Sequence, residues 1–350
     1  MVFYLSFAKL LDFIISLKNF KAKGHYFLIK FENVSKIYSK DLVAVNNISL
    51  EVKKGETLVL LGTSGSGKTT TMRMINKLET STSGNIYIDD KNIEEIDSIE
   101  LRRKIGYAIQ YIGLFNHMNV FENISIVPKL LKWDRERIKK RVDELLKIFG
   151  FDPDEYKNRF PTQLSGGEKQ RIGVLRAIAA DPPIILMDEP FGALDPITRE
   201  QVQNEFIELE SNIQKTIVFV THDVFEAVKM ADRIALMDNG KILQIATPKA
   251  LVSSPKNELV KQFLGRHKFQ LSLMTTTIKE IFDRPKTETT LSFFKEKNKL
   301  TPRSSIIDAL DLFKETKKSN LAIFDRKFFV GYLHKKDLFN SIANLLKEKV

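Results

Sequence analysis

Three short segments of this chain carry residue types and spacings suited to nucleotide chemistry. Gly62–Thr69 reads Gly-Thr-Ser-Gly-Ser-Gly-Lys-Thr and fits the phosphate-binding loop pattern G-x-x-x-x-G-K-[ST] at every fixed position. Gln163–Arg171 contains a serine and two glycines before a glutamate, and Ile184–Glu189 is an apolar run that ends in two carboxylates. Because the segments occur in this order along one chain, we expect them to serve nucleotide binding together.

The glycine loop can bind phosphate through its backbone. Its small side chains let backbone N–H groups point inward around a β-phosphate, and the helix that begins at Lys68 adds the positive end of its dipole. Lys68 would reach the β- and γ-phosphates, and the Thr69 hydroxyl would hold Mg²⁺. A glycine-rich turn entering a helix is the structural alternative, but it leaves the downstream segments unexplained. The predicted phosphate-binding residues are Gly62, Thr63, Ser64, Gly65, Ser66, Gly67, Lys68, Thr69 and Thr70.

Asp188 and Glu189 follow four apolar residues and precede Pro190. A buried parallel strand that ends there would place both carboxylates at the sheet edge where α/β proteins bind ligands. Asp188 would help to hold Mg²⁺, directly or through water, and Glu189 would orient or deprotonate the attacking water. Carboxylates also end strands as simple turn formers, which is the structural alternative for this pair.

Ser165 and Glu168 have the spacing of a capping box, so a helix is predicted to begin at this point. The free N–H groups of its first turn, the Ser165 hydroxyl, and Gly166 and Gly167, which lack side chains, would form an anion site. Nothing in this segment alone says which anion is bound.

Taken together, Gly62–Thr69, Leu164–Arg171 and Ile184–Pro190 resemble the nucleotide-binding subunit of an ATP-binding cassette transporter, and the resemblance runs from about Phe31 to Leu264. It implies that the anion at the Ser165 segment is the γ-phosphate of ATP held by an opposite cassette, so two chains would form a head-to-tail dimer. It also assigns roles to further residues. These are Gln110 as a sensor of Mg²⁺ and the attacking water, Asp195 in the loop that crosses between cassettes, His222 as the switch histidine, and Tyr38 as the ring against adenine.

The resemblance is narrower than the general cassette. Gly113–Met118, Val127–Trp133 and Asp188–Arg199 are similar to the ATP-binding proteins of importers for quaternary-amine osmolytes such as glycine betaine, carnitine and choline. The implied partners are integral membrane permease subunits and an extracytoplasmic solute-binding protein, with the chain at the cytoplasmic face of the cell membrane. The alternatives are an amino-acid importer of the methionine type and, from another class, a soluble cassette ATPase acting on nucleic acid or ribosomes.

We predict an α/β fold, a P-loop NTPase cassette with a parallel sheet core and a helical subdomain, followed by a small C-terminal α+β domain. The apolar run Thr57–Leu61 leads into the glycine loop, and short apolar strands alternate with helical patterns as in a parallel sheet. The predicted domains are 28–265 for the cassette, with its helical subdomain at about 111–163, and 266–350 for the C-terminal domain. Residues 1–27 form an amphipathic extension, and we hypothesise that the native chain begins at Leu28 instead.

Composition limits the function classes. The chain has no cysteine, which excludes disulfides, thiol catalysis and zinc–thiolate sites. Its net charge of +11 is uneven, because residues 1–30 carry +4 and residues 266–350 carry +8, which leaves −1 for the middle. The basic excess therefore lies in the two flanking segments and not in the cassette body, and we expect no nucleic-acid partner. No stretch of the sequence approaches the roughly 20 uncharged apolar residues that span a bilayer.

The C-terminal segment resembles a cystathionine-β-synthase-type regulatory motif, which members of this osmolyte family often carry. Ser304–Phe313, Leu321–Asp325 and Phe328–Asp337 match one helix–strand–strand–helix copy. Asp337 matches the family's ribose-binding acid, but His334 stands where the family has Ser or Thr, which puts nucleotide binding in doubt. The +8 tail could instead sense ionic strength through an anionic membrane surface, because such attraction falls with salt.

Overall fold

The computed structural model describes residues 27–39, 42–109, 113–192, 194–213, 215–282, 300–325 and 328–347. They fall into two compact units, each considered by itself. The first comprises the described residues up to Glu56 together with Thr69–Val218, and the second comprises Thr57–Lys68 together with the described residues from Phe219 onward. The N-terminal extension predicted for 1–27 lies outside the described residues except for the backbone of Phe27.

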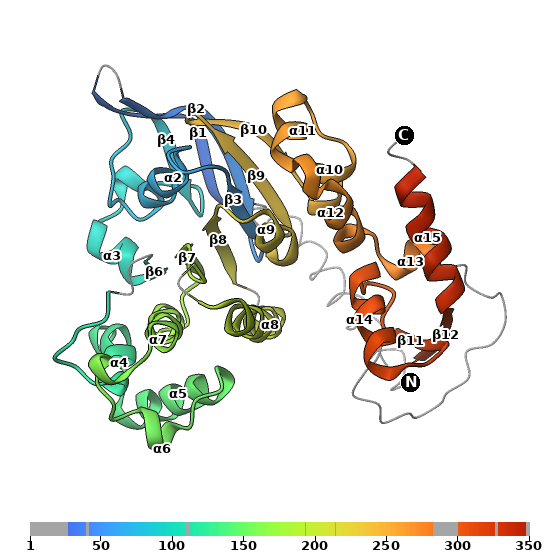
Figure 1. The fold of residues 1–350 in the computed structure, drawn as a ribbon. Helices are drawn as coiled ribbons and strands as arrows, with labels where there is room; N and C mark the ends of the chain where they lie inside the picture. Colours follow the sequence, from blue (N-terminus) through green and yellow to red (C-terminus); the bar gives the residue numbers. More distant parts are fainter. Residues whose placement is uncertain are drawn as a thin grey trace, which may run out of the picture. The chain divides into compact units, whose positions relative to one another are not determined.

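The first unit contains a four-stranded antiparallel sheet in the order β2-β1-β4-β5 (Figure 1). One face of this sheet packs on the core, so buried apolar and exposed polar side chains alternate along its strands. In β2, for example, Ile48 and Leu50 are buried and Ser49 between them is exposed. The strands are β1 (Phe27–Ser39), β2 (Leu42–Lys53), β4 (Ser83–Ile88) and β5 (Lys91–Asn92).

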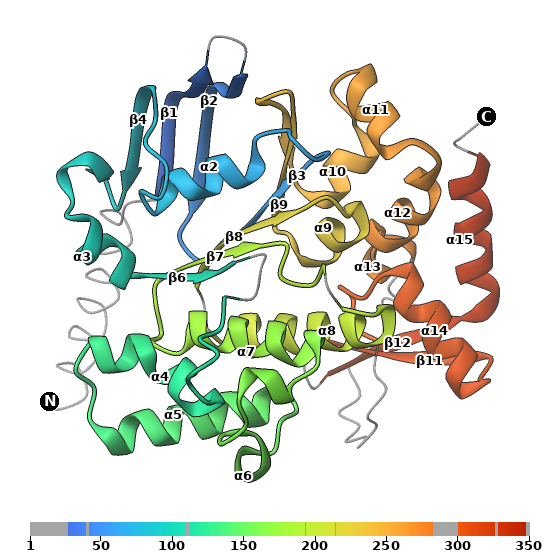
Figure 2. The ribbon, with the colours of Figure 1, turned by 60° about the vertical axis from the view of Figure 1, so that its left-hand side comes forward.

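The same unit holds a parallel pair, β6 (Ile105–Ala108) and β7 (Ile184–Asp188), in which Ile105 lies opposite Ile184. Every residue of β7 is buried, as a parallel strand covered on both faces requires. Figures 1 and 2 show α4 beside α5 and α7, and α4 packs on both. The helices are α2 (Lys68–Ile75), α3 (Ser98–Arg103), α4 (Val120–Leu130), α5 (Arg135–Ile148), α6 (Pro153–Tyr156), α7 (Gly166–Ile178) and α8 (Pro196–Ile213), with short 3-10 turns η1 (Ile93–Glu95) and η2 (Pro161–Gln163). The prediction of mainly helical structure over 111–163 is confirmed for its described residues.

In the second unit β3 (Thr57–Leu61) pairs in parallel with β9 (Arg233–Asp238), and β10 (Lys241–Ala246) runs antiparallel to β9. β8 (Thr216–Thr221) crosses the boundary between the units at Val218 and is buried throughout. The parallel pairs β3–β9 and β6–β7 confirm the predicted parallel core, and β3 leads directly into the glycine loop as predicted. The helices that follow are α9 (Val224–Met230), α10 (Pro248–Ser253), α11 (Glu258–Leu264), the 3-10 turn η3 (Gly265–His267), α12 (Lys268–Thr275) and α13 (Ile278–Ile281).

The chain ends in α14 (Ile306–Thr316), β11 (Asn320–Asp325), β12 (Phe328–His334) and α15 (Lys335–Lys347), which confirms the predicted helix–strand–strand–helix order. These elements have a core of their own, to which α12 and α13 also contribute buried residues. The capping box of Ser305 and Asp308 starts α14. The described residues of these elements thus share one apolar cluster, while the domain bounds 266–350 and the relation to cystathionine-β-synthase motifs remain predictions.

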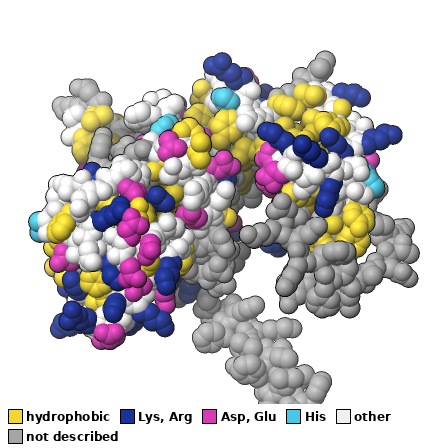
Figure 3. All heavy atoms as spheres, turned by 60° about the horizontal axis from the view of Figure 1, so that its bottom comes forward, with side chains coloured by type: hydrophobic (Ala, Val, Ile, Leu, Met, Phe, Trp, Pro, Cys, Tyr) yellow, Lys and Arg dark blue, Asp and Glu magenta, His cyan; other side chains and the backbone are white. Residues whose placement is uncertain are grey.

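The surface differs between parts of the molecule. In Figure 3, Lys and Arg side chains are interleaved with Asp and Glu over the helices α4–α6, whereas on the C-terminal part, at the right of the view, hydrophobic side chains lie beside Lys and Arg. Among the residues that the structure describes, no helix is both long enough and apolar enough to cross a membrane.

Candidate nucleotide site

Thr69 and Asp188, the two predicted ligands of Mg²⁺, are in direct contact. The Thr69 hydroxyl donates a hydrogen bond of 3.0 Å to Oδ1 of Asp188, which is buried at the end of β7. The hydroxyl proton is used in this bond, so a lone pair of Thr69 Oγ1 stays available for a cation while Asp188 orients the hydroxyl. A hydroxyl and a carboxylate, completed by phosphate oxygens and water, suit the oxygen preference of Mg²⁺.

No group of three or more His, Asp or Glu side chains in the described part of the chain is arranged to hold a metal ion. A cation at Thr69 and Asp188 would therefore take its remaining ligands from a nucleotide and water. This pattern is typical of Mg²⁺, which is commonly bound by one or two protein groups plus substrate phosphates.

Glu189, the predicted general base, has a left-handed backbone conformation with φ of 44°. Such a conformation is uncommon for a residue with a side chain, and it costs on the order of 1–3 kcal/mol unless the surroundings hold it. The turn after β7 supplies part of that hold, because the Glu189 carbonyl accepts a hydrogen bond of 3.2 Å from the Gly192 amide. The left-handed conformation turns the chain sharply at Glu189, the residue that would position water.

Gln170 contacts the predicted general base and is not among the predicted site residues, although it lies in the predicted segment. It is buried in α7, and its side-chain Nε2 donates a hydrogen bond of 3.1 Å to the Glu189 carbonyl. Its Oε1 is buried without a hydrogen-bond partner among the described residues. The available signal was positional, because Gln170 is one helical turn beyond Gly166 and Gly167 and so shares their helix face.

The predicted helix start at Ser165 is confirmed. The Ser165 hydroxyl accepts from the Glu168 amide at 3.2 Å, and Glu168 Oε2 accepts from the Ser165 amide at 2.7 Å. Tyr156 donates to the other Glu168 oxygen at 2.7 Å. Burial acts to raise the pKa of Glu168, but these hydrogen bonds outweigh burial and hold the pKa below its usual range.

The two glycines of this helix start differ in their surroundings. A Cβ added at Gly167 would lie 2.9 Å from Leu194 Cδ2, so a neighbouring loop explains this glycine. A Cβ added at Gly166 would meet nothing within 4 Å. Gly166 therefore has no packing reason within the described chain, and its face of the helix start is open.

The glycine loop is shaped by close backbone approach. Gly62 has φ of 158°, and a Cβ there would lie 2.2 Å from the Met237 carbonyl oxygen, so no other residue fits without displacing backbone. Lys68 is buried, and its ammonium donates to the carbonyls of Gly62 at 2.8 Å and Thr63 at 2.7 Å, and to Ser66 Oγ at 3.3 Å. The Lys68 side chain, the predicted phosphate ligand, therefore folds back onto the loop that precedes it.

The remaining predicted residues are positioned as follows. Asp195 is exposed and accepts from the Thr198 amide at 3.1 Å, and hydrogen bonds from Thr198 lower the pKa of Asp195. Tyr38 is 47% exposed with the Lys36 ammonium 4.8 Å from its ring centroid. His222 is exposed directly after β8. Gln110 lies outside the described residues, immediately after β6 and Ile109.

Within the first unit the structure therefore brings together Thr69 and Asp188, and Gln170 and Glu189. Within the second it brings Lys68 onto the loop Gly62–Gly67. These contacts agree with the predicted grouping of the motifs, while the individual roles of the residues remain predictions.

Comparison with known proteins supports the motifs. Residues 45–192 match the family model described as ABC transporter. The glycine betaine/carnitine/choline transport ATP-binding protein OpuCA of Bacillus subtilis is 49% identical over 301 residues, which cover 86% of this chain and 76% of the relative. The osmoprotectant import ATP-binding protein OsmV of Salmonella typhimurium is 46% identical over 266 residues, covering 75% of this chain and 70% of the relative.

Solved structures show the same fold. The dimeric structure of a post-hydrolysis state of the ATP-binding cassette MJ0796, bound to ADP and Pi, has a TM-score of 0.58 and 34% identity, and the match covers 63% of this chain and 98% of that chain. The structure of CbiO1 from Clostridium perfringens, described as part of the ABC transporter complex CbiONQ, has a TM-score of 0.60 and 27% identity, covering 71% of this chain and 99% of that chain.

Proposed function

Because the chain belongs to the ATP-binding cassette transporter family, we propose that it is the ATP-hydrolysing subunit of an importer for quaternary-amine osmolytes of the glycine betaine, carnitine and choline class. The observation that carries the chemistry is the Thr69–Asp188 contact with the strained Glu189 next to it. The relatives that carry the solute class are transport ATP-binding proteins for glycine betaine, carnitine and choline. No comparison favours the methionine-type or the nucleic-acid alternative.

In this proposal ATP is bound by the loop Gly62–Thr70, with Tyr38 against adenine. Thr69 and Asp188 would hold Mg²⁺, which neutralises charge on the phosphates when bound. Lys68 would leave the loop carbonyls and donate to phosphate oxygens instead, a charge-assisted bond that is stronger than a bond to a neutral carbonyl. Glu189 accepts a hydrogen bond from the attacking water and orients it in line with the γ-phosphate, while Gln110 and His222 contact the same region.

The working form is a head-to-tail dimer in which Ser165, Gly166 and Gly167 of one chain bind the γ-phosphate of ATP held by the other. The open face over Gly166 supports this arrangement, because a glycine that meets no neighbour among the described residues is explained by a close partner. The dimeric cassette structure among the solved relatives is bound to ADP and Pi. Asp195, exposed at the start of α8, would lie at the crossing between the two chains.

An apolar groove in the first unit is the proposed contact for a helix of the membrane permease. The groove has a volume of about 290 Å³ and is lined by β6, α4 and α7, with Phe115, 45% exposed, at its rim. Arg176 spans it, donating to the Gly113 carbonyl at 2.7 Å, and burial lowers the pKa of its guanidinium. β6 leads to Gln110 and α7 begins after Ser165, so a helix seated here would touch the two elements that lead into the nucleotide site.

The proposal places the chain at the cytoplasmic face of the cell membrane, in a complex with permease subunits and an extracytoplasmic solute-binding protein. The C-terminal elements α14 to α15 would form a regulatory domain of the cystathionine-β-synthase type with a single motif. Phe115→Asp in the groove is expected to abolish co-purification with the permease and leave ATP hydrolysis by the isolated subunit within about twofold, because none of the residues that line the groove is a predicted phosphate ligand. Retained assembly would contradict the groove assignment.

The first experiment is ATP hydrolysis by the purified chain, compared with Glu189→Gln and with the exposed control Glu200→Gln. Glu189→Gln is expected to lose about two to three orders of magnitude in kcat, since it removes water positioning, and to elute as a dimer with ATP. The control is expected to match the wild type. If Glu189→Gln keeps most of its activity, or ATP never brings two chains together, the assignment of the base or of the composite site is wrong.

A further inference from the structure

The C-terminal part of the second unit contains a cavity of about 680 Å³, within the size range of small-molecule sites. Three aromatic side chains, Phe282, Phe329 and Tyr332, line it together with His334 and Asp337. Phe329 and Tyr332 meet edge to face with ring centroids 4.9 Å apart, and Tyr332 is 50% exposed. The cavity is therefore open to solvent, and three aromatic rings form part of its wall.

Two local features build this wall. The register of β11 and β12 is irregular between the pairs Ile323↔Gly331 and Phe324↔Phe329, so β12 has an extra residue at this point. Beyond the bulge the pairing with β11 is regular, and Gly331, Tyr332, Leu333 and His334 all line the cavity. Gly331 has φ of 154°, and a Cβ there would lie 2.5 Å from Phe282 Cζ. The glycine thus lets the Phe282 ring pack directly on the strand.

The charges of the cavity favour a cation. Among the described residues that line it there is one carboxylate, Asp337, and no Lys or Arg, although the segment 266–350 as a whole carries +8. The nearby Lys335 ammonium lies 5.9 Å from the ring centroid of Phe339, which does not line the cavity. A phosphate group would find no cationic side chain in this lining, whereas aromatic faces beside a carboxylate attract an organic cation.

We propose that this cavity binds a quaternary ammonium ion, and that the bound ion slows ATP hydrolysis by the same chain. The aromatic faces of Phe282, Phe329 and Tyr332 contact the methyl groups, and Asp337 balances the charge. The choice of solute rests on the proposed function, because an importer of such solutes would then be regulated by its own imported product.

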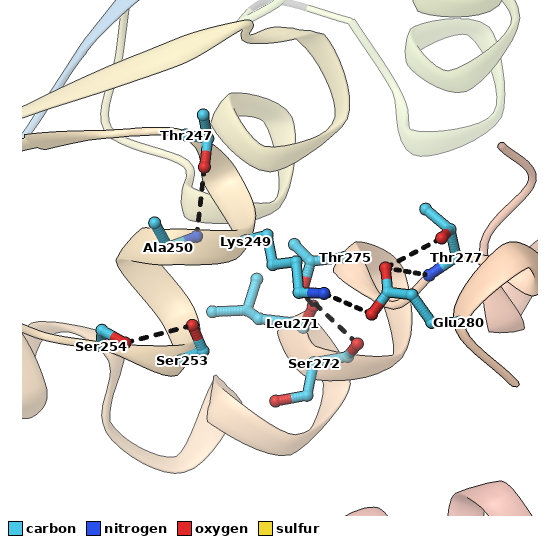
Figure 4. Close-up of polar contacts among 10 residues, drawn as sticks. All are labelled: Thr247, Lys249, Ala250, Ser253, Ser254, Leu271, Ser272, Thr275, Thr277 and Glu280. Atoms are coloured by element: carbon cyan, nitrogen blue, oxygen red, sulfur yellow. Dashed lines mark hydrogen bonds and ion pairs between the residues drawn. The ribbon is translucent and has the colours of Figure 1, made fainter.

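A physical connection from the cavity to the cassette is present in the second unit. Phe282 follows α13 directly, and Glu280 of α13 forms an ion pair with Lys249 of α10 (Figure 4). Glu280 also accepts from the Thr277 hydroxyl at 2.8 Å. The short helix α13, which precedes Phe282, is therefore connected by the Glu280–Lys249 ion pair to α10 of the predicted cassette.

A second connection reaches the switch histidine. α12 packs on α9 and α10 as well as on α14 and α15. Just before α12, the ring of His267 meets the ring of Phe225 of α9 edge to face, at 5.1 Å. α9 begins two residues after His222, with Asp223 as its N-cap. An ion that orders the Phe282 side chain would restrain α13 and α12. Because α12 packs on α9, this would limit the movement of α9 and His222.

Binding of choline to the full chain, measured by calorimetry, tests the site. We expect saturable binding with a dissociation constant on the order of millimolar, as for a few partly exposed cation–π contacts. Tyr332→Leu and Asp337→Asn should weaken it about two- to fivefold each, and Tyr332→Phe should retain it because the ring remains. The matched controls Phe328→Leu and Asp311→Asn change an exposed ring and an exposed carboxylate of the same domain outside the cavity and should bind like the wild type.

The uncharged isostere 3,3-dimethyl-1-butanol should not bind, which separates cation–π attraction from apolar burial. Absence of saturable choline binding, or equal loss in the control variants, would overturn the proposal. The proposal would also be overturned if the cavity bound AMP and not choline, and if Asp337→Asn removed the AMP binding. That result would identify a nucleotide site. If the complete transporter imports choline and yet no choline binds the cavity, the site fails while the proposed function stands; absence of import refutes the solute class instead.

Regulation is tested by ATP hydrolysis with choline chloride against sodium chloride of equal ionic strength. Choline, but not sodium, should lower kcat in the wild type. Lys249→Gln should leave choline binding unchanged and reduce the inhibition at least severalfold, because it breaks the tie between α10 and Glu280. Equal effects of the two salts would refute regulation by the cation and favour a response to ionic strength.

Discussion

Gln170 is predicted to be a positioning residue for the general base, and Gln170→Leu tests this. The substitution removes the 3.1 Å hydrogen bond to the Glu189 carbonyl and keeps similar volume. The carbonyl still accepts from the Gly192 amide, so it is not orphaned, and the lost bond costs about 1 kcal/mol. Removing the buried, unpartnered Oε1 returns a comparable amount. The free energy of unfolding should therefore change by less than about 1 kcal/mol.

Catalysis should respond more strongly than stability. Glu189 holds a left-handed conformation that costs on the order of 1–3 kcal/mol, and the Gln170 bond is one of the contacts that maintain it. If part of that strain relaxes, the carboxylate moves away from the water that it orients, and a displacement near 1 Å costs up to about a hundredfold in rate. We expect kcat to fall about 10- to 100-fold, equivalent to roughly 1.4–2.7 kcal/mol.

The assay is steady-state ATP hydrolysis with thermal unfolding of the same preparations. KM for ATP should change little, because Gln170 is not a predicted phosphate ligand. Gln201→Ala is the matched control, since its side chain makes an exposed bond to Glu205 within α8. A Gln170→Leu protein with kcat within twofold of the wild type would refute the idea that this hydrogen bond positions Glu189.

Further predictions concern the start of α7. Gly166→Ala should change the unfolding free energy of the monomer by no more than about 0.5 kcal/mol, because a Cβ there meets no described atom within 4 Å. The same substitution should reduce ATP-induced dimerisation, measured by size-exclusion chromatography. Unchanged dimerisation would show that Gly166 is not part of the composite site. Glu168 has a pKa below its unfolded value, so its stabilisation is present above about pH 4.3 and is lost as pH falls through the folded pKa. Glu168→Gln should therefore cost about 1 kcal/mol at neutral pH and progressively less on acidification, and a pH-independent difference in urea unfolding would contradict the linkage.

Much of the fold could be predicted from the sequence because the signals are local. The buried strand Thr57–Leu61, the helix start at Ser165 and the final helix–strand–strand–helix each depend on residues close together in the chain, through apolar periodicity and capping. The phosphate-binding loop is also local, since Gly62 and Lys68 act on the backbone between them. For these elements sequence neighbours supply most of the physics.

Tertiary structure alone decided the contacts that make a site. Thr69 and Asp188 are 119 positions apart, and only the packing of α2 and β7 brings their side chains together. The bond from Gln170 to Glu189 depends on how α7 meets the end of β7, which no spacing encodes. Likewise the cavity at Phe282 and Gly331 arises where a bulge in β12 meets the end of α13. Such contacts form because the helices and strands pack together to bury their apolar surface. The sequence shows which residues are apolar, but not how the helices and strands are placed against one another when those residues are buried.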